Sequence, residues 1–211
     1  MRILVGCEYS GIVRNAFASL GHDAWSCDII ETISPGQHIK TDLLNIINDN
    51  WDLVIAFPPC TFLTYAGNRF WSDPLRTVER IKAASFFMSI YNSKCKYICV
   101  ENPNGIMFKL FRLPDQVIHP YYFGEPIVKR TCLWLKNLPL LKYSLLDNLF
   151  FENTACEKPK PITTIYNKDK NVFKYRHLTD YTVKSGQERS LFFSSIALAM
   201  ANQWCKFILD N

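Results

Sequence analysis

The sequence predicts a single α/β domain, in which a mostly parallel, twisted sheet is covered by helices on both faces. Over the first two-thirds of the chain, short and continuously apolar runs alternate with segments whose apolar residues recur at helical spacing. The connections between them are short, which is typical of βαβ units and a parallel sheet. The length of 211 residues is that of one domain with one sizeable core, so residues 1–211 are expected to fold as one unit.

Continuous apolar runs predict four strands in the first half of the chain: residues 2–6, 22–30, 51–56 and 96–100. Two segments with a helical stripe lie between them: residues 11–20 and 74–91. Gly21 follows the first helix as a C-terminal cap, and Asp73 and Pro74 begin the second as N-cap and first helical residue. The apolar residues of the second helix share one face: Leu75, Val78, Ile81, Ala84 and Met88.

The pattern changes beyond residue 114. Residues 116–123 and 129–135 predict further strands, and residues 187–209 predict a long helix. Residues 145–187 have no sustained period and form an irregular, basic insertion. From residue 156 to 176 its lysines and arginines alternate with aromatic residues, and they are Lys158, Lys160, Lys168, Lys170, Lys174 and Arg176. This mixture suits phosphate contact and base stacking, although a solvated loop has the same composition.

Composition narrows the function classes. The formal net charge of +5 permits nucleic-acid binding without requiring it. No apolar stretch is long enough for a membrane span, and the N-terminus lacks the apolar region of a signal peptide, so we expect a cytoplasmic protein that is not secreted. The eight cysteines include no C-x-x-C pair, and most lie in or beside apolar runs. Free, reduced thiols are therefore expected, with neither disulfides nor a structural metal.

Glycines and polar residues follow the predicted strands, at residues 6–11, Asp28, residues 57–60 and residues 101–103. In an open parallel sheet, ligands bind beyond the carboxyl ends of the strands. Glycines in the first turn let a ligand approach the backbone, and an acid such as Asp28 suits a pair of ribose hydroxyls. Each residue alone also has a purely structural explanation, as a turn or a cap. Their joint position indicates a ligand site.

The first turn excludes two common nucleotide sites. Glu8 and Ser10 stand where a G-x-G-x-x-G turn would have glycine or a small apolar residue, and the G-K-[ST] ending of a P-loop is missing. The remaining expectation is a nucleoside-containing cofactor without a pyrophosphate.

Cys60 is the sharpest candidate for chemistry. The two prolines before it stiffen the turn after a strand, so its thiol is expected at a defined place, near helix N-termini that would lower its pKa. Glu101 ends the next strand, where burial would raise the pKa of its carboxyl and let it donate a proton at neutral pH. A buried, inert cysteine and an ordinary, exposed glutamate stay open as alternatives.

In their order along the chain, these segments resemble the cytosine-C5 DNA methyltransferases. Residues 3–11 are similar to the family's cofactor-binding first motif, and residues 51–67 (WDLVIAFPPCTFLTYAG) to its nucleophile motif, P-D-L-L-x-x-G-x-P-C-Q-x-F-S-x-A-G. Residues 100–103 (VENP) resemble the E-N-V segment, and residues 128–135 a reduced Q-x-R-x-R strand. The match covers residues 2 to 135 and returns in the helix near residues 196–204.

The resemblance implies a Rossmann-like class I methyltransferase fold with S-adenosyl-L-methionine as cofactor. It implies that Cys60 adds to C6 of a cytosine, that Glu101 holds a proton on N3, and that Arg130 contacts the target base. The implied cofactor-binding residues are Gly6, Cys7, Glu8, Tyr9, Ser10, Gly11, Asp28, Asp42, Phe57 and Pro58. The expected nucleic-acid-binding residues are Thr61, Asn102, Lys129, Lys158, Lys160, Lys168, Lys170, Lys174 and Arg176, with DNA preferred to RNA.

The chain departs from the family's motifs. Glu8 and Ser10 stand where the first motif has glycines, Thr61 replaces the glutamine after the nucleophile, and Cys132 replaces the second arginine of Q-x-R-x-R. The family's large target-recognition domain has no counterpart except residues 145–187, a shortened pattern shared with methylase-like proteins of phages and large DNA viruses. That likeness implies a bacterial or infected-cell cytoplasm.

Two other functions stay open. A catalytically inactive binding protein of viral origin, built on a methyltransferase fold, would also tolerate the loss of these glycines. An amino-methyltransferase with a motif of the D-P-P-Y type is less favoured, because Phe57 cannot accept a hydrogen bond and Cys60 is not aromatic.

Overall fold

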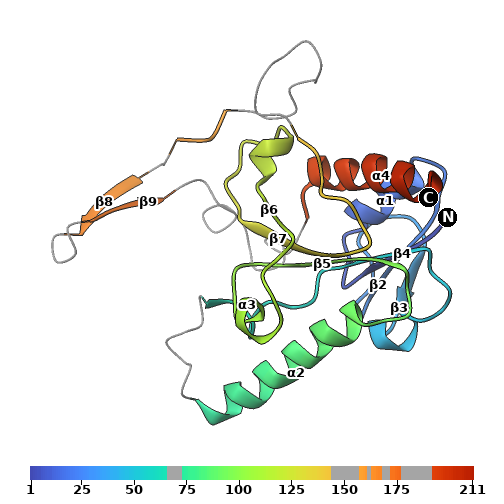
Figure 1. The fold of residues 1–211 in the computed structure, drawn as a ribbon, viewed down its shortest axis with the longest axis horizontal. Coiled ribbons are helices and arrows are strands. Elements are labelled where there is room, and N and C mark those ends of the chain that lie inside the picture. Colours follow the sequence, from blue (N-terminus) through green and yellow to red (C-terminus); the bar gives the residue numbers. More distant parts are fainter. Residues whose placement is uncertain (66–72, 144–156, 161–162, 168–171, 177–191) are drawn as a thin grey trace.

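The computed structural model describes residues 1–65, 73–143, 157–160, 163–167, 172–176 and 192–211 (Figure 1). Seven strands form one sheet: β1 (Arg2–Gly6), β2 (Asp23–Asp28), β3 (His38–Lys40), β4 (Leu53–Ala56), β5 (Tyr97–Asn102), β6 (Gln116–Ile118) and β7 (Thr131–Lys136). Their order is β3-β2-β1-β4-β5-β7-β6, and the first five are parallel, while β7 pairs antiparallel with both β5 and β6. This confirms the predicted Rossmann-like class, with the strand order reversing between β1 and β4.

Helices cover both faces of the sheet, as predicted (Figure 1). On one face lie α1 (Ile12–Ala18) and α4 (Ser194–Leu209), which pack Phe17 and Ile196 into a core with alternate strand residues such as Ile3. On the other face lie α2 (Pro74–Tyr91), α3 (Met107–Leu110) and the 3-10 turn η1 (Leu43–Asn45), whose core includes Phe87 and Val54. The central strands are therefore apolar on both sides, which explains their continuous apolar runs.

The helix caps were mostly predicted. Asp73 is the N-cap of α2, where its side chain accepts a hydrogen bond from Leu75 N at 3.0 Å, and Pro74 is the first helical residue. Helix α1 is shorter than expected and ends at Ala18. Gly21 follows with a left-handed φ of 80° and donates its N–H to Ala18 O at 2.9 Å, so it closes the turn beyond the helix.

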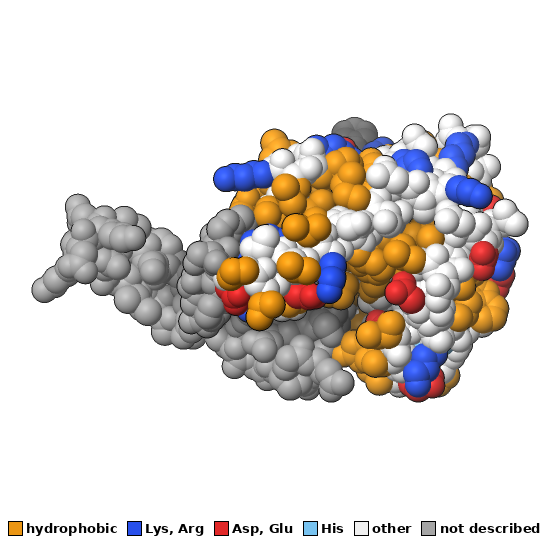
Figure 2. Space-filling model, turned by 90° about the horizontal axis from the view of Figure 1, so that it is seen from below, with side chains coloured by type: hydrophobic (Ala, Val, Ile, Leu, Met, Phe, Trp, Pro, Cys, Tyr) orange, Lys and Arg blue, Asp and Glu red, His pale blue; other side chains and the backbone are white. Residues whose placement is uncertain are grey.

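The apolar face predicted for α2 is only partly buried. Leu75, Val78 and Ile81 are 80%, 51% and 65% exposed. Figure 1 shows the reason, because the N-terminal half of α2 extends away from the sheet, so the helix packs through later residues such as Phe87 and Ile90. Figure 2 looks onto this side of the molecule and shows hydrophobic side chains at the surface among Lys and Arg.

Several boundaries differ from the predictions. Strand β6 ends at Ile118, because Pro120 has no N–H for a ladder and instead begins the 3-10 turn η3 (Pro120–Phe123). Helix α4 begins at Ser194, and residues 192–193 before it are not helical. The short β3 and η1 had no sustained sequence pattern and were not predicted.

The stretch predicted to be irregular contains two strands. β8 (Thr163–Asn167) and β9 (Val172–Arg176) form a separate antiparallel pair (Figure 1). Their β-branched and aromatic residues favour strands, although the stretch as a whole has no sustained period. The rest of residues 145–187, apart from residues 157–160, lies outside the described residues.

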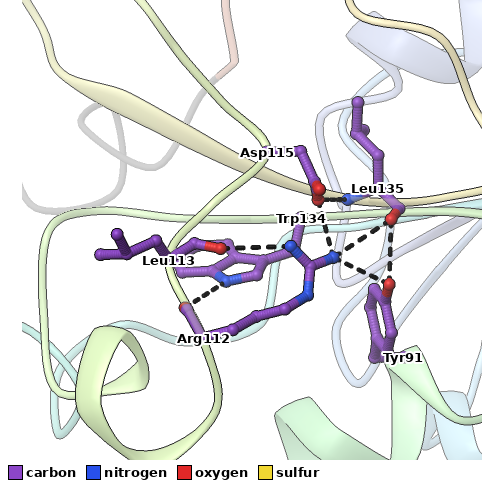
Figure 3. Close-up of polar contacts among 6 residues, drawn as sticks. All are labelled: Tyr91, Arg112, Leu113, Asp115, Trp134 and Leu135. Atoms are coloured by element: carbon purple, nitrogen blue, oxygen red, sulfur yellow. Dashed lines mark hydrogen bonds and ion pairs between the residues drawn. The ribbon is translucent and has the colours of Figure 1, made fainter.

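A polar network ties the end of α2 to β7 (Figure 3). The Arg112 guanidinium donates to Tyr91 Oη at 2.8 Å, to Asp115 Oδ2 at 2.7 Å and to Leu135 O at 3.2 Å. Asp115 Oδ2 also accepts from Leu135 N at 2.7 Å, and Trp134 Nε1 donates to Arg112 O at 3.0 Å. These contacts tie β7 to the end of α2 and to the segment before β6.

The seven cysteines that the structure describes are free thiols, and Cys156 lies outside that part of the chain. Among the described residues, no group of His, Cys, Asp and Glu is arranged to hold a metal ion. The helices in the described ranges are all too short or too polar to cross a membrane.

Candidate active site

The candidate site lies at the carboxyl ends of β4 and β5. These strands are parallel neighbours, with Ala56 opposite Val100, so the segments that follow them leave the sheet side by side. Phe57 to Cys60 follow β4, and Glu101 lies near the end of β5. The structure therefore brings Cys60 and Glu101 to one edge of the sheet, as the strand pattern predicts.

The two segments are bonded to each other directly. Asn102 Nδ2 donates to Pro58 O at 2.8 Å, and both residues are buried. Farther along, Thr64 forms an antiparallel bridge with Gly105, and Ile106 N donates to Leu63 O at 2.8 Å. We call the segments 57–65 and 101–106 the paired loops. Their bonds fix the position of Cys60 relative to Glu101.

Gly105 makes this close approach possible. A Cβ atom at this position would lie 2.0 Å from Leu63 O and 2.8 Å from Leu63 C, far inside van der Waals contact with backbone that has little freedom to move. Any side chain at residue 105 would therefore push the paired loops apart.

Cys60 begins a tight turn. Its carbonyl accepts from Leu63 N at 3.0 Å and from Thr64 N at 2.9 Å, and the residue is exposed at the surface. Thr61, which the resemblance places on nucleic acid, is also exposed. The residue is thus held on a rigid turn at the surface, although protein atoms surround much of its thiol.

Electrostatics match one expectation and contradict another. Burial raises the pKa of Glu101 to about 7, although the charge of Lys129 opposes the rise, so this carboxyl is partly protonated at neutral pH as predicted. The pKa of Cys60 is raised rather than lowered. Burial of the thiol is the larger cause and the charge of Glu101 the second, and together they outweigh a backbone hydrogen bond and Lys129. The expected activation by helix N-termini is therefore wrong for this structure.

Among the described residues, Lys129 is the cation whose charge acts on this pair. Its charge acts on both Cys60 and Glu101, and its ammonium lies 5.0 Å from the centroid of the Phe193 ring. Arg130, which the resemblance makes catalytic, is exposed, and its charge and a hydrogen bond act on Cys132 instead. The sequence contains no signal that would rank the two, because they are neighbours just before β7.

Asn102 has a different place from the one predicted. Its side chain is 1% exposed and its amide bonds Pro58, so it braces the paired loops and does not reach nucleic acid. Its Oδ1 is buried with no hydrogen-bond partner among the described residues. Pro58, predicted to touch a cofactor, is buried behind the loop, whereas the half-buried Phe57 packs on Phe192 with ring centroids 4.6 Å apart.

The first turn is built around Glu8. Its Oε1 accepts from Val13 N at 2.7 Å and from Ser10 Oγ at 3.2 Å, and its Oε2 accepts from Arg14 N at 3.2 Å. Glu8 thus caps the N-terminus of α1, a place where ligand anions bind in many proteins. Glu8 and Ser10 are 4% and 6% exposed and their side chains bond within the turn, so a cofactor at this turn would meet mainly their backbone.

Neighbouring side chains occupy the space beside the two glycines of this turn. A Cβ on Gly6 would lie 2.4 Å from Leu43 Cδ2, and one on Gly11 would lie 2.2 Å from both Arg14 Nη2 and Ser34 Oγ. Gly11 also has a left-handed φ of 73°. Their side-chain spaces are filled by neighbours, so a ligand could meet only their backbone.

A second cluster lies at the ends of β1 and β2. Thr41 N donates to Asp28 O at 3.0 Å and Glu8 N donates to Cys27 O at 3.1 Å, so Asp28 lies beside the segments that carry Asp42 and Cys7. Burial is the main cause that raises the pKa of Cys7, and the charges of Asp28 and Asp42 raise it further. Asp28 Oδ1 accepts from Ile30 N at 3.2 Å, and Asp42 caps η1 by accepting from Leu44 N at 2.9 Å. Tyr9 is half-buried in the same turn. These predicted cofactor residues are brought together, beside the exposed side chain of Ile29, which is 72% accessible.

Sequence reasoning missed Arg14. It is fully buried, and its guanidinium donates to Ser26 Oγ at 3.0 Å, to Ser34 Oγ at 2.7 Å and to Pro35 O at 2.7 Å. Arg14 therefore holds the loop between β2 and β3 against α1. No local pattern reveals this role, because the three acceptors named above lie 12 to 21 positions away in the sequence.

The predicted basic contacts are placed only in part. Lys158 and Lys160 are exposed. Lys174 and Arg176 belong to β9, of which only the backbone is described. Lys168 and Lys170 lie outside the described residues, and so does the end of the nucleophile motif at Gly67.

Neither a family model nor a curated protein matches this chain. Solved structures similar to it include a candidate DNA modification methyltransferase encoded within an E. coli prophage, at 16% identity and a TM-score of 0.45, covering 70% of this chain and 52% of that one. Another is the Entamoeba histolytica methyltransferase EhMeth, at 15% identity and a TM-score of 0.45, covering 76% of this chain and 58% of that one. The chain thus spans little more than half the length of these proteins.

Proposed function

We propose that this protein is an S-adenosylmethionine-dependent methyltransferase that acts on C5 of cytosine in nucleic acid, with DNA preferred, through a covalent adduct at Cys60. The observation that supports it most is the pairing of the thiol of an exposed residue with a carboxyl whose pKa is about 7, on two loops bonded to each other. The resemblance of the segments around Cys60 and Glu101 to the cytosine-C5 enzymes supplies the reaction.

The residues at the ends of β1 and β2 fit the cofactor. Because Glu8 already takes the helix N-terminal N–H groups, the turn suits a nucleoside that has no phosphate, as S-adenosylmethionine has none. Asp28 would take its ribose hydroxyls, and Asp42 and the exposed Ile29 lie where they could meet its base. When bound, S-adenosylmethionine supplies a methyl group activated by its sulfonium.

The chain's own residues would perform the remaining steps. Cys60 loses its proton and its sulfur adds to C6 of the cytosine, which makes C5 nucleophilic. Glu101 in its protonated form holds a hydrogen on N3, so that the ring accepts the sulfur. After methyl transfer, loss of the C5 proton to a base lets the C6–S bond break and frees Cys60. Arg130 is exposed and would contact the base or its phosphate.

The partner follows from charge and access. Lys158 and Lys160 are exposed on the segment that leads to β8, and further cations follow on β9. They would bind phosphates, and this part of the binding would weaken as salt rises. A base reaches Cys60 only outside a stacked duplex, so a flipped or single-stranded cytosine is required, at a cost of a few kcal/mol for a paired base.

A nucleoside analysis tests the proposal. DNA and RNA are incubated separately with the protein and methyl-labelled cofactor, digested, and examined by mass spectrometry for 5-methylcytosine. Cys60→Ser is expected to abolish the product, since the hydroxyl is a far weaker nucleophile than the thiol. A single strand containing 5-fluorocytosine should form a covalent adduct with wild-type protein, because fluorine blocks the loss of the C5 substituent. Undiminished activity in Cys60→Ser would refute the assigned chemistry.

A second candidate is a catalytically inactive binding protein on the same fold. The raised pKa of Cys60 favours it, because a protonated thiol is a poor nucleophile. Titration calorimetry with S-adenosylhomocysteine separates the two functions, since an inactive scaffold without a cofactor site releases no heat of binding.

A further inference from the structure

Four segments that are distant in sequence meet at the candidate site. Besides the paired loops, these are Lys129, just before β7, and Phe192 and Phe193, just before α4. Phe193 is 6% exposed, and the Lys129 ammonium lies 5.0 Å from its ring centroid. Phe192 packs on Phe57 with centroids 4.6 Å apart, and Phe57 begins the segment that ends in Cys60. The residues just before α4 therefore contact both Lys129 and Phe57, the residue that begins the Cys60 segment.

The start of α4 is itself fixed. Ser195 N donates to Glu125 Oε1 at 2.8 Å, and Ala197 N donates to Phe193 O at 2.9 Å. Phe193 is packed into the core that joins α4 to the sheet. The electron-rich face of an aromatic ring attracts an ammonium, so a rigid Phe193 restricts where the Lys129 side chain can rest.

Among the described residues, the charges that act on the Cys60 thiol are those of Glu101 and Lys129, which have opposite signs. The charge of Glu101 also acts on the buried thiols of Cys99 and Cys132. When Cys60 ionises, its proton passes to water and a negative charge appears on Sγ. A neutral Glu101 does not repel that charge, and a nearby ammonium stabilises it.

We propose that Lys129 is the positioning residue that makes Cys60 a usable nucleophile: Phe193 holds its ammonium where it stabilises the Cys60 thiolate. The inference rests on the proposed function and deepens it, by adding a cation that lies outside the arginine positions of the Q-x-R-x-R motif. Lys129 acts through Cys60 and Glu101 and is assigned no contact with the methyl group.

Alkylation of Cys60 by iodoacetamide measures its thiolate without any methyl transfer. The rate constant is followed on the Cys60 peptide by mass spectrometry, from about pH 6 to 9, in wild type, Lys129→Met, Lys129→Arg, Phe193→Leu and Lys206→Met. At about pH 7.5, Lys129→Met is expected to lower the rate constant about threefold or more and to move the profile to higher pH. Lys129→Arg should restore most of the rate, and Phe193→Leu should lose part of it.

Lys206→Met is the matched control, because it removes the same charge from an exposed position near the end of α4, and it should follow wild type. A Lys129→Met profile that coincides with wild type overturns the inference. Circular dichroism on the same samples identifies a variant that has unfolded. If Lys129→Met unfolds, folded Phe193→Leu decides the matter: a lowered rate constant supports the inference, and a profile that coincides with wild type overturns it. Loss of the fold in both variants refutes a role limited to Cys60.

Methyl transfer by the same preparations separates this inference from the proposed function. If wild type shows no transfer that depends on Cys60, but Lys129→Met still shifts the alkylation profile, the function is wrong and the role of Lys129 stands. If wild type transfers methyl groups and Lys129→Met changes neither the profile nor kcat, the inference alone is wrong.

Discussion

Replacing Glu101 with glutamine should make the protein more stable at alkaline pH. Burial raises the pKa of this carboxyl from 4.5 to about 7. Between these values the folded state holds more protons than the unfolded state, so the free energy of unfolding falls as pH rises through this window and levels off above it. This rise in pKa lowers the free energy of unfolding of wild type by at most about 3 kcal/mol by pH 8. Glu101→Gln has no carboxyl there and does not lose this stability.

Urea unfolding followed by tryptophan fluorescence at about pH 5 and pH 8 measures this difference. The gain of Glu101→Gln over wild type should be small at the lower pH and should grow by about 1 to 3 kcal/mol at the higher one. Glu31→Gln is the matched control. Its side chain is 73% exposed and pairs with Lys40 at 3.1 Å, so it should lose less than about 1 kcal/mol at pH 8.

The reasoning fails if Glu101→Gln is no more stable than wild type at pH 8, or if its gain is the same at both pH values. Under the proposed mechanism the same variant should lose most methyl transfer, because an amide cannot supply the carboxylic proton to N3. Stability gained where activity is lost is a common property of catalytic groups held in unfavourable surroundings.

Three further substitutions test the framework around the site. Gly105→Ala should separate the paired loops and lower kcat by about 100-fold, since a misplacement of about 1 Å can have that effect. Gly21→Ala is the control, because Gly21 has a left-handed φ but a Cβ there would meet no atom within 4 Å. It should lower the free energy of unfolding in urea by only about 1 kcal/mol and leave activity unchanged. Equal activities would show that contact with Leu63 is unimportant. Arg112→Met should lower the free energy of unfolding by about 2 kcal/mol and leave Cys60 alkylation unchanged, so altered alkylation would contradict a purely structural network. Glu8→Ala should lower it by about 1 to 2 kcal/mol through loss of the cap, and an unchanged thermal melting temperature would count against that role.

Much of the fold could be predicted because its signals are local. A strand buried on both faces needs a continuous apolar run, and a helix N-terminus needs a cap such as Asp73, so both are visible in a few consecutive residues. The order of strands then places Cys60 and Glu101 at one edge without any knowledge of distances. Glu101 lies at the end of a central strand, so its burial, and therefore the upward shift of its pKa, could also be expected.

The rest depended on which distant residues meet. Whether Lys129 or Arg130 faces Cys60 is decided by the rotation of the chain before β7 and by Phe193, more than 60 residues later in the sequence. The capping of α1 by Glu8 and the exposure of Leu75 are likewise decided by the shape of a turn and by how far a helix extends beyond the sheet. The sequence by itself thus determined the layers of the fold and the placement of Cys60 and Glu101 near the ends of neighbouring strands. Only the tertiary structure decided the charges around that pair, because electrostatic and packing energies depend on distances that no local pattern contains.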